Sequence, residues 1–386
     1  MNQKPPFLVI GTPGDRRIDL FQQALLSSGE PEARLISYLD LLQQRTSLSA
    51  YLSPETIVRI ESPGKNQQVE RALLTLGAEL EDPEGVPYQR LSTSLLAALP
   101  FEKGLLLPSR QWYLGYKKMI GCLHPQLLGV RLFNQPEDIL LMFDKRACHR
   151  FLALHAIPVP PALDPISCYE ELRQQMIQRH WPRVFIKPAH GSSAAGIIAY
   201  RCQGTRQQAI TTIEMVSDES DGYRLYNTRR IRTYSDAAQI EQLINALCLH
   251  RVHVEQWIPK AGYQDQVFDC RIVVINGQAQ HAVVRLSHSP MTNLHLLNQR
   301  GDLNVIRQQL GEDNWQAALH TCERAAALFP KSLYVGVDLL FAAHHPEHHA
   351  ILEMNAFGDL LPRLLCNGQD TYSAELAALL KGSSDA

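Results

Sequence analysis

Residues 334–358 read YVGVDLLFAAHHPEHHAILEMNAFG. Two apolar runs, 334–341 and 350–354, flank a polar, histidine-rich octet at 342–349. Val, Ile, Leu and aromatic residues fill both runs, and this pattern predicts an antiparallel β-hairpin with an eight-residue connection. Each run also contains one acidic residue, which is unusual in a strand that is otherwise apolar enough to be buried.

The register of this hairpin predicts a metal site. If Phe341 pairs with Ala350, then Asp338 faces Glu353, and Asn355 points to the same side because it lies two residues further along the strand. Directly opposed Cβ atoms are about 5 Å apart, so the two carboxylates repel each other. A divalent cation removes that conflict, and oxygen ligands of this kind suit Mg²⁺. The alternative is the solvated outer face of an amphipathic hairpin, which the apolar runs disfavour.

A second motif lies upstream, where residues 184–198 read VFIKPAHGSSAAGII. A short strand ends at Lys187, and a loop of small residues follows from His190 to Gly196. The backbone N–H groups of such a loop, with the hydroxyls of Ser192 and Ser193, can donate to phosphate oxygens. The residues after the loop are not those of a P-loop. An ordinary Gly/Ser turn is the alternative interpretation.

The two motifs, in this order, resemble the ATP-grasp superfamily, and in particular RimK-like amino-acid ligases, D-alanine–D-alanine ligase and glutathione synthetase. Four further segments resemble family motifs; they are FDKRACHRFLALHAIPVP (143–160), VEQWI (254–258), FDCRIVVINGQ (268–278) and VVRLS (283–287) followed by Asn293. The resemblance covers roughly residues 130–365. It departs from the family after Asn355, where the chain reads AFGDLLPRLL, so the resemblance does not identify the substrates.

The resemblance implies a function for particular residues. The implied nucleotide-binding residues are Lys145, Lys187, His190, Gly191, Ser192, Ser193, Gly196, Glu255, Gln256, Trp257, Ile258 and Asp269. Asp269 is expected near the ribose, with Asp265 as the competing candidate. Arg271 and Arg285 are the implied catalytic residues, and Asp338, Glu353 and Asn355 match the magnesium ligands.

The implied activity is that of an ATP-dependent ligase. ATP would phosphorylate a carboxylate to an acyl-phosphate, and an amine or a thiol would then displace phosphate, which leaves ADP and phosphate as by-products. The expected cofactors are ATP and one or two Mg²⁺ ions, with Mn²⁺ as a possible substitute. The expected partners are small-molecule or peptide carboxylate and amine substrates. A kinase that phosphorylates a small molecule and a non-catalytic nucleotide-binding regulator remain as alternatives.

The expected fold combines α/β and α+β parts. Residues 1–130 open with a β-α-β pattern, which predicts an N-terminal domain with a parallel sheet. Residues 131–250 are expected to form the ATP-grasp subdomain with the glycine loop and an insertion near 202–235. Residues 251–386 are expected to form the subdomain with the metal-binding hairpin.

Composition excludes several other classes of protein. A net charge of −2 across 386 residues indicates no nucleic-acid-binding surface. Eight scattered cysteines form no CxxC pair, so neither a zinc site nor a disulfide framework is predicted. Free thiols and the lack of a signal-peptide pattern predict a cytoplasmic location, and no stretch is apolar enough to predict a membrane span.

Three groups of basic residues have two interpretations each. Arg59, at the end of a predicted strand, is a substrate-binding candidate or, with more weight, a solvated arginine. The cluster Arg229, Arg230 and Arg232 either meets an anionic substrate or protects a strand edge. The histidines of the hairpin connection, between His344 and His349, suggest a metal site, but a solvated loop is the favoured interpretation.

Overall fold

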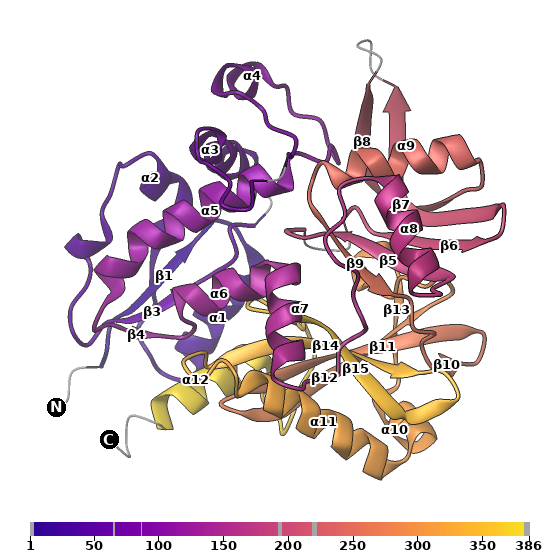
Figure 1. Ribbon diagram of the computed structural model, residues 1–386. Helices are drawn as coiled ribbons and strands as arrows, with labels where there is room; N and C mark the ends of the chain where they lie inside the picture. Colours follow the sequence, from indigo (N-terminus) through magenta and orange to yellow (C-terminus); the bar gives the residue numbers. More distant parts are fainter. Residues whose placement is uncertain (1–3, 65, 86, 192–194, 218–221, 382–386) are drawn as a thin grey trace.

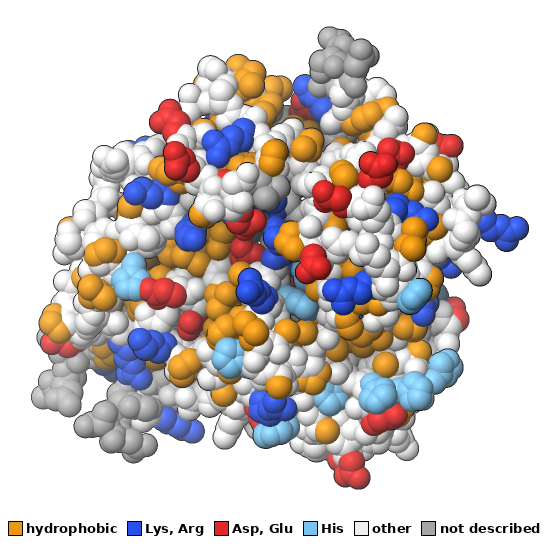
Figure 2. All heavy atoms as spheres, viewed as in Figure 1, with side chains coloured by type: hydrophobic (Ala, Val, Ile, Leu, Met, Phe, Trp, Pro, Cys, Tyr) orange, Lys and Arg blue, Asp and Glu red, His pale blue; other side chains and the backbone are white. Residues whose placement is uncertain are grey.

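The computed structural model describes residues 4–64, 66–85, 87–191, 195–217 and 222–381. Three β-sheets organise the chain, and helices cover them (Figure 1). Acidic and basic side chains are interspersed over the face shown in Figure 2. None of the helices in the described ranges is long and apolar enough to cross a membrane.

The N-terminal sheet is parallel, as the β-α-β pattern predicts, with the strand order β2-β1-β3-β4. Its strands are β1 (Phe7–Gly11), β2 (Arg34–Ser37), β3 (Ile57–Ile60) and β4 (Arg131–Leu132). Its helices are α1 (Arg16–Ser27), α2 (Tyr38–Leu42), α3 (Gln67–Ala78), α4 (Thr93–Ala98) and α5 (Ser109–Leu123), with short 3-10 turns η1 (Leu48–Ala50) and η2 (His124–Leu127). Because β4 belongs to this sheet, the sheet extends just past the expected boundary at residue 130.

Two glycines let α3 and α5 cross at very short range. A Cβ atom on Gly77 would lie 2.0 Å from the carbonyl oxygen of Gln111, and one on Gly115 would lie 1.9 Å from that of Leu73. Any larger residue would therefore separate the two helices.

The second sheet is antiparallel, with the order β8-β7-β6-β5-β9. Its strands are β5 (Arg183–Pro188), β6 (Ile198–Gln203), β7 (Arg206–Ser217), β8 (Tyr223–Tyr234) and β9 (Val252–Gln256), and its helices are α8 (Tyr169–Gln178) and α9 (Ala237–Cys248). The stretch 202–235, expected as an insertion, supplies two long strands of this sheet. Residues of β7 and β8 share one apolar core with α8 and α9, so the stretch is integral to the subdomain.

The third sheet has the order β13-β12-β11-β14-β15, with β10 paired to β11. Its strands are β10 (Gly262–Tyr263), β11 (Gln266–Ile275), β12 (Gln278–Ser287), β13 (Gln299–Gly301), β14 (Tyr334–Ala342) and β15 (His345–Asn355). Around it lie α6 (Pro136–Phe143), α7 (Lys145–Leu154), α10 (Leu303–Leu310) and α11 (Glu312–Ala326), whereas η3 (Leu294–Leu296) contacts β8 of the second sheet. The last helix, α12 (Thr371–Lys381), returns to pack on α1 (Figure 1).

Strands β14 and β15 form the predicted antiparallel hairpin, and Asp338 faces Glu353 as expected. The expected pairing of Phe341 with Ala350 is wrong, because Phe341 pairs with His349. A β-bulge after Asp338 shifts the register by one residue on one strand. The connection is also shorter than eight residues, since both strands continue into the polar octet.

Arg59 is fully buried, so its interpretation as a solvated arginine is wrong. Its guanidinium donates to Glu61 at 2.6 Å, to Glu375 at 2.7 Å, and to Asp359. It also donates to the hydroxyl of Tyr334 at 3.1 Å. The network joins β3 of the N-terminal sheet to the C-terminal part of the chain, and such a buried charge is tolerated only because it is paired and hydrogen-bonded.

This network holds more negative than positive groups. Three buried carboxylates face Arg59, and the only further cation within ion-pair distance among the described residues is Arg17, 3.9 Å from both Glu61 and Asp359. Burial raises the pKa of Glu375 well above its ordinary value, although Arg59 opposes that effect. The folded protein therefore binds a proton in this network more strongly than the unfolded chain does.

We expect Glu375→Gln to flatten the pH dependence of stability. The pKa of Glu375 is higher in the folded protein than in the unfolded chain. At any pH above the ordinary pKa of glutamate, unfolding therefore releases a proton, and the free energy of unfolding falls as pH rises. One proton contributes a slope of at most about 1.4 kcal/mol per pH unit. Urea unfolding between pH 5 and pH 8 should show the variant gaining stability relative to the wild type as pH rises. Glu241→Gln, at an exposed position of α9, is the control; equal behaviour of the two variants would contradict this account.

Candidate active site

Alternation along β11 separates core residues from polar ones. Cys270, Ile272 and Val274 join the apolar core that includes Trp315 and Ala318 of α11. Asp269 and Arg271 point to the opposite face because side chains alternate along a strand. That face of the sheet borders a cavity of about 870 Å³.

Two rows of charged residues cross this face. In one row, Arg271 pairs with Asp338, which pairs with Glu353. In the adjacent row, Asp269 pairs with Arg285. The second row continues onto β13, where Arg300 lies opposite Arg285. Arg271 and Asp338, which are 67 positions apart along the chain, are thus brought within one cross-strand spacing by register alone.

Arginines neutralise the first carboxylate of the predicted metal site. Asp338 accepts from Arg271 Nε at 2.5 Å and Nη2 at 3.1 Å, and Arg285 Nη1 lies 3.1 Å away. Burial raises the pKa of Asp338, but the two guanidinium groups outweigh burial and lower it below its ordinary value. The repulsion expected between Asp338 and Glu353 is therefore relieved by cationic side chains of the protein itself.

The second carboxylate is neutralised by a lysine. Lys145, the first residue of α7, places Nζ 2.7 Å from Glu353 Oε1 and also donates to the carbonyl oxygen of Gly191. Asn355 lines the same cavity, and its side-chain nitrogen is buried without a hydrogen-bond partner. The carboxylate and amide oxygens of Asp338, Glu353 and Asn355 form a donor set that fits a hard divalent cation.

Asp269 lies in a buried network of its own. It accepts from Arg285 Nε at 2.6 Å, from Lys260 Nζ at 2.8 Å, and from the hydroxyl of Thr292. Burial raises the pKa of Asp269, and the two cations lower it by more. Asp269 borders the cavity, whereas Asp265, the competing candidate for the ribose contact, is exposed and is not among the lining residues.

The second sheet contributes a lysine–glutamate pair. Lys187 at the end of β5 donates to Glu255 of β9. Burial raises the pKa of Glu255, but Lys187 and then His253 lower it to about 2. Gln256 and Ile258 also line the cavity. Trp257 does not line it, and its ring lies 5.3 Å from that of Phe185.

The glycine loop lies only partly within the described residues. Gly191 lines the cavity, and Ser192 and Ser193 fall outside the described residues. Gly196 has a φ of +75° and its N–H donates to Asn227 of β8. The structure places His190 away from the cavity lining, where it is buried between Asp144, 3.2 Å away, and the ring of Tyr113.

All three parts of the protein line the cavity. From the N-terminal part come the turns after β1 and β3, which include Thr12, Asp15, Arg16, Arg17, Ser62 and Asn66. From the third part come Lys260, Thr292, His295, Arg300 and the segment 355–358, with Leu360, Leu361 and Pro362. Apart from Asn355, none of these residues belongs to a motif with recognisable spacing, so the sequence alone does not identify them. Lys260 lies close to one of the motifs identified in the sequence, VEQWI at 254–258.

The other basic groups considered in the sequence lie outside this cavity. Arg229 and Arg230 are exposed on β8, and Arg232 pairs with Glu214 of β7. None of the three lines the cavity.

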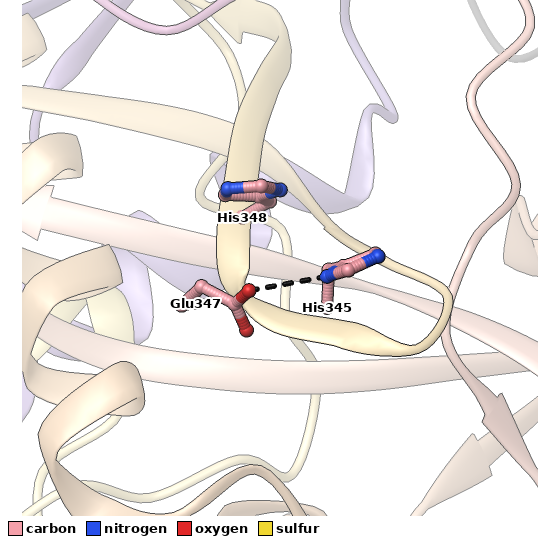
Figure 3. A group of neighbouring side chains, drawn as sticks. All are labelled: His345, Glu347 and His348. Atoms are coloured by element: carbon pink, nitrogen blue, oxygen red, sulfur yellow. Dashed lines mark hydrogen bonds and ion pairs between the residues drawn. The ribbon is translucent and has the colours of Figure 1, made fainter.

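Histidines gather at the edge of the molecule where the β14–β15 hairpin turns (Figure 2). Ligand atoms of His345, Glu347 and His348 lie within 4.8 Å of one another, and His345 Nδ1 is 3.2 Å from Glu347 Oε1 (Figure 3). All three side chains are exposed, so no packing fixes their geometry and we assign no site to them. His349 instead packs inward, with Nε2 2.8 Å from the hydroxyl of Thr321 on α11, so it is not part of a solvated loop.

No protein-family model and no curated protein sequence matches this chain significantly. Solved structures do match it over almost its whole length. D-cycloserine synthetase DcsG is 14% identical, with a TM-score of 0.54 over 97% of this chain and 99% of that one. The macrocyclase MdnC from Microcystis aeruginosa MRC, bound with precursor peptide MdnA, is 12% identical, with a TM-score of 0.52 over 97% and 99%.

The ATP-grasp ligase PsnB complexed with minimal precursor is 14% identical, with a TM-score of 0.52 over 98% of this chain and 100% of that one. D-alanine–D-alanine ligase from Bacillus anthracis complexed with ATP is 10% identical, with a TM-score of 0.51 over 99% and 98%. The three sheets, the order of their strands and these similarities confirm the expected fold class. This chain has the ATP-grasp fold.

Proposed function

We propose that the protein is an ATP-dependent ligase that joins a carboxylate to an amine through an acyl-phosphate, with release of ADP and phosphate. The observation that carries this proposal is the row Glu353–Asp338–Arg271, which borders one cavity together with Lys145 and Lys187. It supplies oxygen ligands for a cation and positive charge for phosphates in the same place. Solved ligases with this fold, one of them complexed with ATP, support the proposal.

ATP would bind between the second and third sheets. Lys145, Lys187 and the N–H groups around Gly191 would meet the phosphates, while the hinge residues Glu255, Gln256 and Ile258 would border the adenine. Asp338, Glu353 and Asn355 would hold one or two Mg²⁺ ions, or Mn²⁺ in their place. A bound divalent ion neutralises phosphate charge and fixes the orientation of the terminal phosphoryl group.

Nucleotide binding would exchange the partners of several side chains. Lys145 now pairs with Glu353, and Lys187 with Glu255. When Glu353 and Asp338 become metal ligands, Lys145 turns to the phosphates, and Arg271 and Arg285 become available to the reacting groups. Without substrates, the lysines and arginines of the cavity thus pair with carboxylates of the protein. When substrates bind, charged groups of the substrates would replace these carboxylates as partners.

The proposed chemistry has two steps. An oxygen of the acid attacks the γ-phosphorus, and the bond to the β–γ bridging oxygen breaks as ADP leaves. The amine then attacks the carbonyl carbon, loses a proton, and expels phosphate, which retains the oxygen of the acid. Arg271 and Arg285 would stabilise negative charge on the transferring phosphoryl group and on the tetrahedral intermediate.

Removal of either lysine should weaken ATP binding. We expect Lys145→Ala and Lys187→Ala each to raise the Kd for ATP about tenfold or more, because a charge-assisted hydrogen bond is lost. Isothermal titration calorimetry checks this, with Lys118→Ala on the exposed face of α5 as the control. Unchanged affinity in both alanine variants, with thermal unfolding showing that they fold, would refute the assignment.

Glu353→Gln should abolish stabilisation by magnesium-ATP. A ligand at 100 times its Kd stabilises the folded state by about 2.7 kcal/mol, and the variant should lose most of this because a charged metal ligand is gone. Without ligand, Tm should stay the same or fall slightly, because Lys145 loses its partner. Differential scanning calorimetry with and without magnesium-ATP measures both effects. Glu347→Gln, an exposed position of the same strand, is the matched control; equal stabilisation of the two variants contradicts the metal site.

An isotope experiment tests the acyl-phosphate. An acid labelled with ¹⁸O in its carboxylate should transfer one ¹⁸O atom to inorganic phosphate in each turnover, which ³¹P NMR detects as an isotope shift. Pyrophosphate as the main product would indicate adenylation instead. A phosphorylated product that accumulates without an amine would indicate a kinase, and no ADP with any acid would indicate a regulator that only binds nucleotide.

A further inference from the structure

The cavity extends beyond the residues assigned to ATP and metal, into a crevice of the N-terminal sheet. In the order β2-β1-β3-β4, the chain leaves β1 toward β2 on one side and returns to β3 on the other. The carboxyl ends of β1 and β3 therefore flank a topological switch point, where open α/β sheets bind ligands. Residues 12–17 after β1, and Ser62, Gly64 and Asn66 after β3, line the cavity at that place.

Three arginines from different elements are anchored on one segment that borders this crevice. Arg17 donates to the carbonyl oxygen of Phe357 at 3.0 Å, Arg271 to that of Gly358 at 3.2 Å, and Arg300 to that of Pro362 at 2.9 Å. The segment itself is held close to β14, where a Cβ atom on Gly358 would lie 2.4 Å from the Cα of Gly336. The three guanidinium groups are thus oriented before any substrate binds.

The charge of this crevice is not balanced from within. Arg17 lies 3.9 Å from both Glu61 and Asp359, so part of its charge is compensated. Among the described residues no carboxylate lies within ion-pair distance of Arg16 or Arg300. Asp15, the remaining acidic residue of the turn, accepts from the backbone N–H of Arg17 and caps α1.

Arg300 is also placed opposite Arg285 on neighbouring strands. Like charges at directly opposed positions destabilise a sheet. Arg285 is compensated by Asp269 and Asp338, but Arg300 is not. An anion bound beside Arg300 would remove this cost.

We propose, on the basis of the function proposed above, that the acid substrate is a small dicarboxylate. One carboxylate reacts at Arg271 and Arg285, and the other, which does not react, binds at Arg300, with Arg16 and Arg17 as further cations that line the same cavity. Opposed residues on neighbouring strands are about 5 Å apart. That spacing matches two carboxyl groups separated by two or three methylene groups, as in succinate, glutarate, aspartate and glutamate.

The test compares each dicarboxylate with its monoamide, which has nearly the same shape and one charge less. The pairs are succinate and succinamate, glutarate and glutaramate, aspartate and asparagine, and glutamate and glutamine. Hydroxylamine serves as the amine because it traps acyl-phosphates as hydroxamates, which are measured together with ADP. We expect kcat/KM for at least one dicarboxylate to exceed that of its amide by about tenfold or more.

Variants assign the preference to the arginines. Arg300→Gln and Arg16→Gln should raise KM for the dicarboxylate about tenfold or more and leave KM for the amide and Kd for ATP unchanged, while Arg300→Lys should recover part of the loss. Arg179→Gln, an exposed arginine at the end of α8, is the control. Equal use of acid and amide by the wild type, or weaker ATP binding in Arg300→Gln, overturns the proposal.

A direct measurement of binding distinguishes a failure of this proposal from a failure of the ligase function on which it rests. If no acid forms a hydroxamate, the ligase function fails, and the crevice is then tested by calorimetry with glutarate and glutaramate. Saturable binding of glutarate that Arg300→Gln abolishes supports the anion site. Absence of binding, or equal binding of glutarate and glutaramate, overturns it.

Discussion

The buried ion network around Arg59 joins the two ends of this chain. Arg59 belongs to β3 of the N-terminal sheet, whereas Asp359 and Glu375 belong to the last thirty residues. A fully buried guanidinium group must be paired with carboxylates, because an unpaired buried charge costs several kcal/mol of folding free energy. The network therefore fixes the position of the segment after β15 relative to the carboxyl ends of β1 and β3. The crevice of the cavity exists only because these two regions are held together.

The active-site face shows a related principle, since its carboxylates and cations neutralise one another in the free protein. Asp338, Glu353, Asp269 and Glu255 each accept from at least one lysine or arginine. These contacts keep the charged side chains oriented in a partly buried cavity. A nucleotide and metal ion bound as we propose would compete with these internal ion pairs, so binding would exchange partners instead of introducing charge into an apolar site.

The parts of the site that lie on strands and the parts that lie on loops come from different layers. The rows of charged residues lie on β11, β12, β14 and β15, whose opposite face packs against α11. Gly191 follows β5 of the second sheet, and the N–H of Gly196 donates to Asn227 of β8. The position of the proposed metal ligands on strands gives them fixed spacing, while loops from two other parts of the chain complete the cavity.

The sequence by itself determined the local elements and the motifs with short spacing. Apolar alternation and turn residues predicted the hairpin and the parallel N-terminal sheet, because these signals act between neighbours in the chain. The facing of Asp338 and Glu353 was predicted from an assumed register, which holds from Gly336 to Asp338 and fails at Phe341. The β-bulge after Asp338 was not predicted, since it depends on how β15 packs against its neighbours.

Only the tertiary structure decided which charges meet. Nothing local distinguishes Arg59, which is buried among carboxylates up to 316 residues away, from an exposed arginine at a strand end. The pairing of Lys145 with Glu353, and of Arg285 with both Asp269 and Asp338, likewise depends on sheet order and not on spacing in the chain. Burial and long-range pairing are properties of the assembled sheets, and for that reason the crevice between the N-terminal sheet and the segment after β15 could not be identified from the sequence.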